Sequence, residues 1–369
     1  MDYLQERVTT LHDLTDPVPD APVSDSAVVV PIAGESLEDV TPAYIFDPLE
    51  TVAPGEVVVP LRTPADVAAG FREWVADYDL DVTTLWCDAQ RLETLLETHG
   101  LGGERGKGRD VWLGVGVAAD RADYVAVHDA DARTYSPAVV HRLLAPLAME
   151  HDFVKGYYAR VEDGRLYGRL VRLFVAPLLR ALDDRHDAAV VEYLSAFRYP
   201  LAGEFSFTAE VARTLRAQRA WGLEIGMLGE TFEVVGPDRS AQADLGVHRH
   251  DHKPVSGRGG LSGMADQVGQ ALFRALEAGG VDPDYGTLRE AYRDAATRLV
   301  SQYAADAAFN GLEYDTESER EQVEAYVSGI QPPGSDTRLP AWADTDLSSA
   351  AVLDAGRVGN SLPNGSRSD

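Results

Sequence analysis

Four short runs of β-branched and other apolar residues constrain the fold of this chain most strongly. Nearly continuous apolar runs of this length are typical of strands that are covered on both faces in a parallel sheet. Segments with helical periodicity lie among them at 63–78 and 108–120. This alternation predicts βαβ crossovers and an open, doubly wound α/β sheet, whose ligands bind at the carboxyl ends of the strands. The four runs are residues 26–34, 55–62, 81–88 and 122–131.

The second half of the chain is more helical. Strands are expected at 153–161 and at 243–255, the latter leading into a loop, and Pro177 is expected to bend one of the helices. The expected helices are residues 136–150, 169–182, 224–236, 262–278, 285–309 and 316–329.

Both ends of the chain differ in composition from the middle. Residues 1–24 predict a short amphipathic helix followed by a linker rich in proline and aspartate. Residues 331–369 are rich in Pro, Gly, Ser and Asp, and we expect a disordered tail there. Between them we expect an α/β domain at 25–260 and a C-terminal helical extension at 261–330.

The charge balance restricts the class of partner. Lys and Arg together number 33 against 60 Asp and Glu, which gives a net charge of −27. Nucleic acids and anionic membranes require cationic surfaces, so neither is expected as a partner. The acidic residues are scattered, which predicts a hydrated surface suited to a halophilic cytoplasm. Lysine occurs only at Lys107, Lys155 and Lys253, and Lys155 is expected to reach the surface.

Cysteine usage and hydropathy indicate the compartment. The single cysteine, Cys87, lies in an apolar stretch and is expected to be buried. The N-terminal residues lack the basic flank and apolar segment of a secretion signal, and no apolar run reaches membrane-spanning length. We therefore expect a soluble cytoplasmic protein without membrane insertion.

The triplet Asp129-Ala130-Asp131 follows the last of the four apolar runs. Alternation along a strand sends the two carboxylates to the same side, at the edge where such sheets bind ligands. Two carboxylates suit a hard divalent cation, Mg²⁺ or Mn²⁺, that also takes oxygens from a diphosphate. The alternative interpretation is a solvated turn after a strand.

Three histidines alternate at His248, His250 and His252. In an extended chain they project from one face, a spacing suited to a site and awkward for a buried core. A trihistidine zinc site and exposed histidines on an edge strand are the alternatives.

Two further motifs could contact a ligand. Lys107 lies between Gly106 and Gly108 just before a helix, where glycine permits close backbone approach and the helix N-terminus favours phosphate. An ordinary glycine-rich surface loop is the alternative. Glu224 opens a largely apolar helix and could act on a ligand or simply interact with the helix dipole.

The order and spacing of these motifs resemble glucosyl-3-phosphoglycerate synthase and its mannosyl-transferring relatives, which are retaining GT-A-type enzymes of glycosyltransferase family 81. The resemblance runs from about residue 26 to about residue 280. It implies a mostly parallel GT-A sheet for residues 25–260. It is carried by the segments VVVPIAGES, GKG, DAD, FVKGYYAR, GRL, PLAGEF, GLEIGMLGETF and ADLGVHRHDHKP.

The resemblance implies a donor site for a UDP- or GDP-hexose, with glucose or mannose as the sugar. Family positions assign the nucleotide base to Pro31, Ile32 and Glu35 and the rest of the nucleotide to Gly106 and Lys107. They assign the cation to Asp129, Asp131 and His250. The remaining donor positions are Ala130 in the triplet and, around the sugar, Leu201, Gly203 and Glu224.

The acceptor side departs from the family pattern. Gly168 and Arg169 match the pair that binds a small anionic acceptor such as 3-phosphoglycerate, but Val171 stands where the family has threonine. His252 replaces an asparagine that also belongs to the acceptor site, and Trp221 replaces a tyrosine. Arg169, His252 and Lys253 supply cationic donors for an anionic acceptor.

The mechanism expected from the residues and the resemblance is metal-dependent transfer with retention. The cation and Lys107 neutralise the leaving diphosphate, and Glu224 orients sugar or acceptor hydroxyls. A sugar-phosphate nucleotidyltransferase and a non-catalytic nucleotide-sugar-binding protein are the alternatives. The last helices could mediate a homodimer or pack within the chain.

Overall fold

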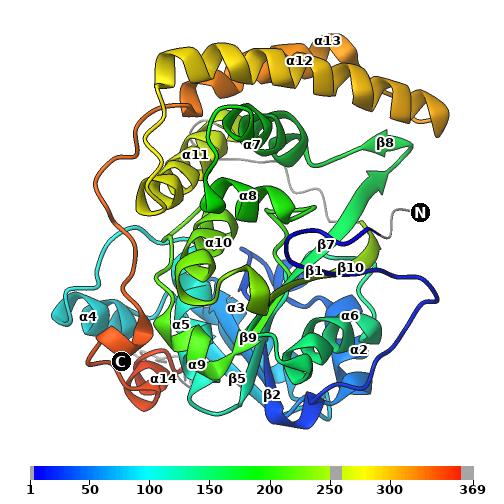
Figure 1. Cartoon of the computed structure of the whole chain (residues 1–369). Coiled ribbons are helices and arrows are strands. Elements are labelled where there is room, and N and C mark those ends of the chain that lie inside the picture. The colour runs from blue at the N-terminus through cyan, green and yellow to red at the C-terminus, as the bar shows by residue number, and fades with distance from the viewer. Residues whose placement is uncertain (1–3, 250–259, 359–369) are drawn as a thin grey trace, which may run out of the picture.

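The computed structural model describes residues 4–249 and 260–358 of the chain. They form ten strands in one sheet with helices on both faces (Figure 1). The strand order is β1-β10-β7-β9-β6-β2-β4-β3, with β5 added beside β4 and β8 beside β7.

The predicted strands are confirmed, with small shifts at their ends. β2, β4, β5 and β6 pair in parallel, and β7 pairs in parallel with β10. The short strand β9 was not predicted, and it runs antiparallel between β6 and β7. The strands are β1 (Thr9–Leu11), β2 (Ser26–Val29), β3 (Ile32–Ala33), β4 (Glu56–Arg62), β5 (Val82–Trp86), β6 (Tyr124–Val127), β7 (Phe153–Glu162), β8 (Arg165–Leu166), β9 (Phe205–Thr208) and β10 (Ser240–His248).

The helices also follow the periodicity of the sequence. Regular α-helices are α1 (Leu37–Val40), α2 (Ala43–Val52), α3 (Ala65–Val75), α4 (Gln90–Thr98), α5 (Lys107–Ala119), α6 (Pro137–Leu144), α7 (Ala176–Asp183), α8 (Ala189–Ala196), α9 (Ala209–Thr214), α10 (Leu223–Val234), α11 (Gly260–Ala278), α12 (Tyr285–Phe309), α13 (Thr316–Tyr326) and α14 (Ser349–Ala355). Single turns of 3-10 helix are η1 (Val23–Asp25), η2 (Ala145–Met149), η4 (Pro237–Arg239), η5 (Val327–Gly329) and η6 (Trp342–Asp344).

The helix expected to bend at Pro177 is split into two parts. A π-helical turn, η3 (Val171–Val175), runs directly into α7, and Pro177 is the second residue of α7. Proline has no N–H to donate, so the hydrogen-bond pattern changes next to it.

Both faces of the sheet are buried, which explains the continuous apolar runs. Along β2, Val28 packs in the core on one face and Val29 in the core on the other. Val57 and Val58 of β4 divide in the same way. Cys87 is buried as expected.

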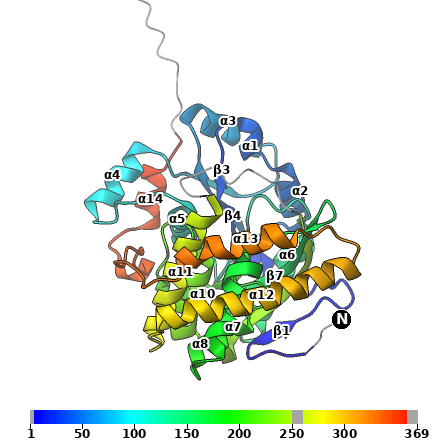
Figure 2. The same cartoon turned by 90° about the horizontal axis from the view of Figure 1, so that it is seen from above.

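We call α11, α12 and α13 the helical extension; α11 packs against α10, and α12 packs against α7. Figures 1 and 2 show α12 and α13 lying across the end of the molecule above α7. The strands β2, β6, β7 and β10 run in one direction, and β7 points toward this extension (Figure 1). Among the described residues, no helix is both long and apolar enough to cross a membrane.

Two expectations for the chain ends are wrong. The described part of residues 1–24 holds no α-helix, and Thr9–Leu11 instead adds strand β1 to the edge of the sheet beside β10. Residues 331–358 are not a disordered tail, because they contain α14 and bury Leu339 and Trp342. Scattered apolar residues in a Pro- and Gly-rich segment gave no periodic signal that a sequence pattern could detect.

Candidate functional site

Three side chains from separate elements meet beyond the carboxyl end of β6. Lys107 is the first residue of α5, Glu224 lies in the first turn of α10, and Asp129 follows β6. The Lys107 Nζ atom lies 2.6 Å from Oδ1 of Asp129 and 2.8 Å from Oε1 of Glu224. The structure therefore brings together the GKG, DAD and G-x-E-I-G motifs, which are far apart in the sequence.

Gly203 leaves room for the carboxylate of Asp129 in this cluster. A Cβ atom built on Gly203 would lie 2.0 Å from Oδ2 of Asp129, closer than any real contact. Only glycine fits beside the carboxylate at this position in the segment that leads into β9. Leu201, two residues earlier, is partly buried and packs against the core.

Charge interactions set the protonation of the cluster. Burial opposes the charge on Lys107, but Asp129 and Glu224 outweigh it and raise the pKa of Lys107 above its ordinary value. Burial and the negative charge of Asp129 raise the pKa of Asp131 to about 6, while Lys107 and Arg160 act in the opposite direction. Oδ1 of Asp131 is buried and has no hydrogen-bond partner among the described residues.

Two further ionisable side chains, Lys155 and Glu204, lie buried next to the cluster. Lys155, expected at the surface, is 1% exposed, because β7 is covered by its neighbours on both sides. Its Nζ donates to the carbonyl of Ala202 and lies over the ring of Phe205. Burial lowers the pKa of Lys155 to about 8, although Glu224 and Glu204 oppose the change.

Glu204 is fully buried beside Gly203. Among the described residues, neither carboxyl oxygen of Glu204 accepts a hydrogen bond of ordinary geometry. Tyr158 nevertheless lies close enough to stabilise the ionised carboxylate and so lower its pKa. Burial, followed by the charge of Asp129, raises the pKa of Glu204 to about 8. The acid is therefore largely protonated at neutral pH.

The end of β10 approaches the same edge of the sheet. His248 is 1% exposed, contrary to the expectation that this histidine row avoids the core, and its ring stacks on Tyr158 at 4.0 Å. Burial lowers the pKa of His248 to about 4. The next residue, Arg249, accepts a hydrogen bond from the N–H of Arg133 at 2.7 Å. His250, His252 and Lys253 lie outside the described residues.

The residues assigned to the nucleotide lie along the same edge. Ile32 is buried in β3, and Pro31 precedes it. Glu35 is exposed just before α1, where its N–H donates to Asp39. Gly106 is the N-cap of α5, and Tyr44 donates to the carbonyl of Ala130.

The acceptor pair lies at the start of the π-helical turn. Gly168 has φ +76°, and a Cβ atom there would lie 2.7 Å from the hydroxyl of Tyr199. Arg169 donates from Nε to Glu319 of α13 at 2.8 Å and is about one third exposed. Val171, the departure from the family pattern, is buried. The helical extension thus contacts the expected acceptor residue.

Arg160 is a charged residue of this site that the sequence analysis missed. Burial disfavours the charge on Arg160, but Tyr199 and Tyr158 outweigh it and raise its pKa, with Asp131 adding to the effect. Tyr158 and Arg160 stand two residues apart on β7, so both point to one face. A second basic residue in the strand that already carries Lys155 was the signal that could have identified Arg160.

The described residues provide part of a binding site for a hard divalent cation. Asp129 and Asp131 supply carboxylate oxygens, and the orphaned Oδ1 of Asp131 is a buried acceptor suited to a cation. Among the described residues, no group of three or more His, Cys, Asp or Glu side chains could hold a metal. The third expected ligand, His250, lies outside those residues.

Known proteins match this chain over most of its length. A scan against protein-family models gives no match. The glucosyl-3-phosphoglycerate synthase of Methanococcoides burtonii is 31% identical over 375 residues, which cover 93% of each chain. That of Persephonella marina is 36% identical over 273 residues, covering 70% of this chain and 68% of the relative. This chain belongs to the glucosyl-3-phosphoglycerate synthase family.

Solved structures of the family have the same fold. A crystal structure of glucosyl-3-phosphoglycerate synthase from Mycobacterium tuberculosis with Mn²⁺, UDP and phosphoglyceric acid superimposes with a TM-score of 0.54 at 24% identity. The match covers 75% of this chain and 88% of that chain. A further structure of that enzyme contains UDP-glucose and phosphoglyceric acid with Mn²⁺. The expected GT-A-type α/β fold is confirmed.

Proposed function

We propose that this chain is a retaining glucosyltransferase that moves glucose from UDP-glucose to 3-phosphoglycerate and requires Mg²⁺ or Mn²⁺. The observation that carries the proposal is the meeting of Lys107, Asp129 and Glu224 at the carboxyl end of β6. Open α/β sheets bind ligands at this edge. Membership of the family supplies the choice of glucose and of 3-phosphoglycerate.

The donor diphosphate is proposed to bind at the start of α5. The positive end of a helix favours an anion, and Lys107 adds a full charge there. The pKa of Lys107 is raised, so the side chain stays protonated through the neutral range. It can therefore stabilise negative charge that develops on the leaving phosphate.

Asp129, Asp131 and His250 are the proposed metal ligands. Arg249 is hydrogen bonded to Arg133, two residues after Asp131, which supports a third ligand from the end of β10. A bound Mg²⁺ or Mn²⁺ supplies charge neutralisation at the diphosphate oxygens. If Asp129 held the cation, the Lys107 ammonium would lose part of its contact with Asp129 and could turn toward the phosphate.

Glu224 and the groups around β7 complete the proposal. Glu224 is 8% exposed and accepts from Lys107, so its carboxylate can hold a sugar or acceptor hydroxyl in a fixed direction. Arg160 and Arg169 provide positive charge for the carboxylate and phosphate of the acceptor. We place the reaction in the cytoplasm, in agreement with one buried cysteine that forms no internal disulfide.

A matrix of donors and acceptors tests the function. UDP-glucose, GDP-glucose and GDP-mannose are each incubated with 3-phosphoglycerate or glycerol 3-phosphate, in high salt, with Mg²⁺, Mn²⁺ or a chelator. We expect release of UDP only when UDP-glucose, 3-phosphoglycerate and a metal are all present. Release of pyrophosphate from UTP and glucose 1-phosphate, with no transfer to any acceptor, would contradict the proposal.

A further inference from the structure

Residues 330–358 form a strap that runs from the helical extension to the helices α4 and α5 (Figure 1). The strap leaves η5, passes α11 and α10, and ends with α14 against α4 and α5. Leu339 is fully buried and Trp342 is 5% exposed. The strap is therefore part of the packed structure and contacts both helices whose first turns carry the site.

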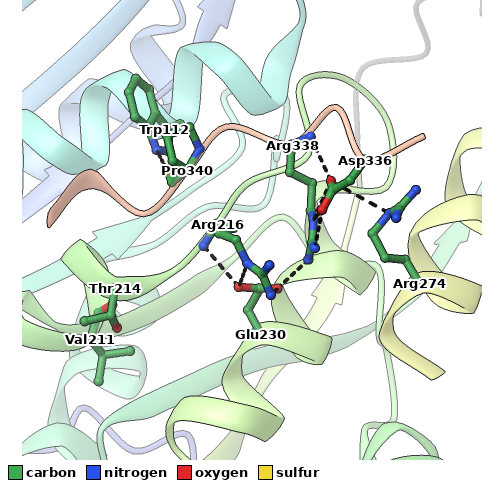
Figure 3. A network of polar contacts seen from close by, with 9 residues as sticks. All are labelled: Trp112, Val211, Thr214, Arg216, Glu230, Arg274, Asp336, Arg338 and Pro340. Atoms are coloured by element: carbon green, nitrogen blue, oxygen red, sulfur yellow. Dashed lines mark hydrogen bonds and ion pairs between the residues drawn. The ribbon is translucent and has the colours of Figure 1, made fainter. Parts of the chain in front are cut away.

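A network of ion pairs fixes the strap to α10 (Figure 3). Glu230 of α10 accepts two bonds from the guanidinium of Arg216, at 2.8 and 2.9 Å, one from its backbone N–H at 3.3 Å, and one from Arg338 of the strap at 2.5 Å. Arg338 also donates to both oxygens of Asp336, and Arg274 of α11 donates to the carbonyl of Gly334 at 2.6 Å. The side chains of Glu230 and Arg338 are 8% and 10% exposed. Such buried, forked pairs fix geometry more strictly than surface pairs.

The strap also holds the loop of residues 216–222, which leads into α10. Ala217 and Leu339 exchange two backbone hydrogen bonds, at 2.8 and 3.1 Å. Arg219 donates from Nε to the carbonyl of Thr337 at 2.8 Å. Gly222, the last residue of the loop, is the N-cap of α10, two residues before Glu224.

The same loop touches the start of α5. The N–H of Arg109 donates to the carbonyl of Arg219 at 2.8 Å. A Cβ atom on Gly108 would lie 1.8 Å from the carbonyl oxygen of Gln218, so helix and loop are in direct backbone contact. The loop thus connects the first turn of α5, which carries Lys107, to the first turn of α10, which carries Glu224.

The far half of the strap packs on the middle of α5. The indole N–H of Trp112 donates to the carbonyl of Pro340 at 2.9 Å, and the rings of Trp112 and Trp342 lie 4.7 Å apart. A Cβ atom on Gly116 would lie 2.2 Å from Trp342, so this ring rests directly on the helix backbone. The strap therefore contacts α5 near its middle and, through the loop, at its first turn.

We propose that Arg338 is a positioning residue for the donor site, acting through the 216–222 loop on Lys107 and Glu224. The expected effect on kinetics rests on the proposed function. The expected effect on the loop rests on the contacts described above. Without the pairs of Arg338 with Glu230 and Asp336, the strap holds the loop only through the backbone bonds of Leu339 with Ala217 and through Arg219, and the spacing of the two helix ends is less firmly fixed.

Hydrogen–deuterium exchange of the unliganded chain tests the structural half. In Arg338→Gln we expect about tenfold faster exchange in peptides covering 106–110 and 216–226, because the pairs that hold the loop are lost. The matched control is Arg91→Gln, which removes an exposed pair between α4 and Asp354 of the same strap. Arg91→Gln should leave those peptides unchanged. Equal exchange in Arg338→Gln and wild type would overturn the proposal.

Steady-state kinetics test the functional half, well below the melting temperature of each variant. We expect Arg338→Gln to raise KM for UDP-glucose and lower kcat, each by up to about tenfold, with KM for 3-phosphoglycerate unchanged. Arg338→Lys keeps one of the two contacts and should recover part of the loss. A purely structural role predicts a lower melting temperature with unchanged kcat and KM, and that result refutes positioning.

A second variant covers the case in which Arg338→Gln fails to fold. Arg219→Gln cuts the link between loop and strap at the carbonyl of Thr337 and leaves the pairs of Arg338 intact. Arg219→Gln should show the same exchange pattern in a milder form. Unchanged exchange in this variant would overturn the proposal. Should the wild-type chain release no UDP, the proposed function fails, and the exchange data alone decide whether Arg338 positions the loop.

Discussion

The ammonium of Lys107 lies 2.6 Å from Oδ1 of Asp129, which joins the first residue of α5 to the first carboxylate after β6. The same ammonium donates to Glu224 at 2.8 Å. One of only three lysines in the chain therefore links the two acidic motifs of the donor site. Its removal leaves two neighbouring carboxylates with no cation between them.

Lys107→Met is expected to lower kcat/KM for UDP-glucose by about 100- to 1,000-fold. The variant loses the positive charge that is held in place to stabilise the leaving phosphate. Lys107→Arg should recover only part of the rate, since the planar guanidinium does not place its charge at the same point. Initial rates of UDP release provide the measurement. The control is Arg293→Gln, which removes an exposed cation paired with Glu324 on the helical extension. A Lys107→Met variant with the wild-type rate would rule out this role.

Gly203→Ala is expected to inactivate the site while the chain still folds. The new methyl group would meet Asp129 at 2.0 Å and force the carboxylate from its place. A displacement of about 1 Å can cost about 100-fold in rate. Gly334→Ala is the matched control, because its Cβ atom would meet its nearest neighbour at an ordinary 3.8 Å. Comparable activity in both variants would show that the close approach to Asp129 does not matter.

Glu204 should make stability fall as pH rises. Its pKa is raised from 4.5 to about 8, so the folded chain holds a proton that the unfolded chain has released. Between these two values the free energy of unfolding should decrease by up to about 1.4 kcal/mol per pH unit. Glu204→Gln removes this dependence, and its stability should approach or exceed that of the wild type at pH 8.

Urea unfolding from pH 5 to pH 8, with a chelator present, measures the difference between the wild type and Glu204→Gln. Since Asp131 titrates in both proteins, it largely cancels in the comparison. Parallel curves for the two proteins over this range would mean that Glu204 is ionised in the folded state.

The sequence predicted the longer strands because both faces of the sheet are buried, but it did not predict the helices α2, α4 and α8. Continuous runs such as the one that became β4 have few structural alternatives. The short strand β9 was missed, since four residues after the PLAGE segment carry too little periodic signal. The antiparallel pairing of β9 with β6 and β7 depends on contacts distant in the sequence.

The residues of the proposed donor site could be selected from the sequence, but their surroundings could not. Lys107, Asp129 and Glu224 were identified from rare or paired residues, and the structure brings them together. Burial of Lys155 was missed, because a lysine in a strand is usually read as exposed and only the position of β7 in the sheet decides otherwise. Contacts such as the pair of Arg169 with Glu319 join segments 150 residues apart, and no local pattern encodes them.

The strap supplies a prediction about stability. Trp342→Ala removes a ring that packs on Trp112 and Gly116, and such a buried truncation should cost about 3–5 kcal/mol of unfolding free energy. Phe309→Ala is the control, because Phe309 is 89% exposed at the end of α12, and it should change stability by less than about 0.5 kcal/mol. Equal urea midpoints for the two variants would restore the view of residues 331–358 as a dispensable tail.

Product formation by the wild type and by Asp131→Asn tests the account most directly. Each protein is incubated with UDP-glucose, 3-phosphoglycerate and Mg²⁺, and the products are identified by mass spectrometry and by the NMR signal of the anomeric proton. The account predicts α-linked glucosyl-3-phosphoglycerate and UDP from the wild type, and no product from Asp131→Asn at an unchanged melting temperature. Wild-type turnover in Asp131→Asn, or no glucosyl transfer by the wild type, would contradict it.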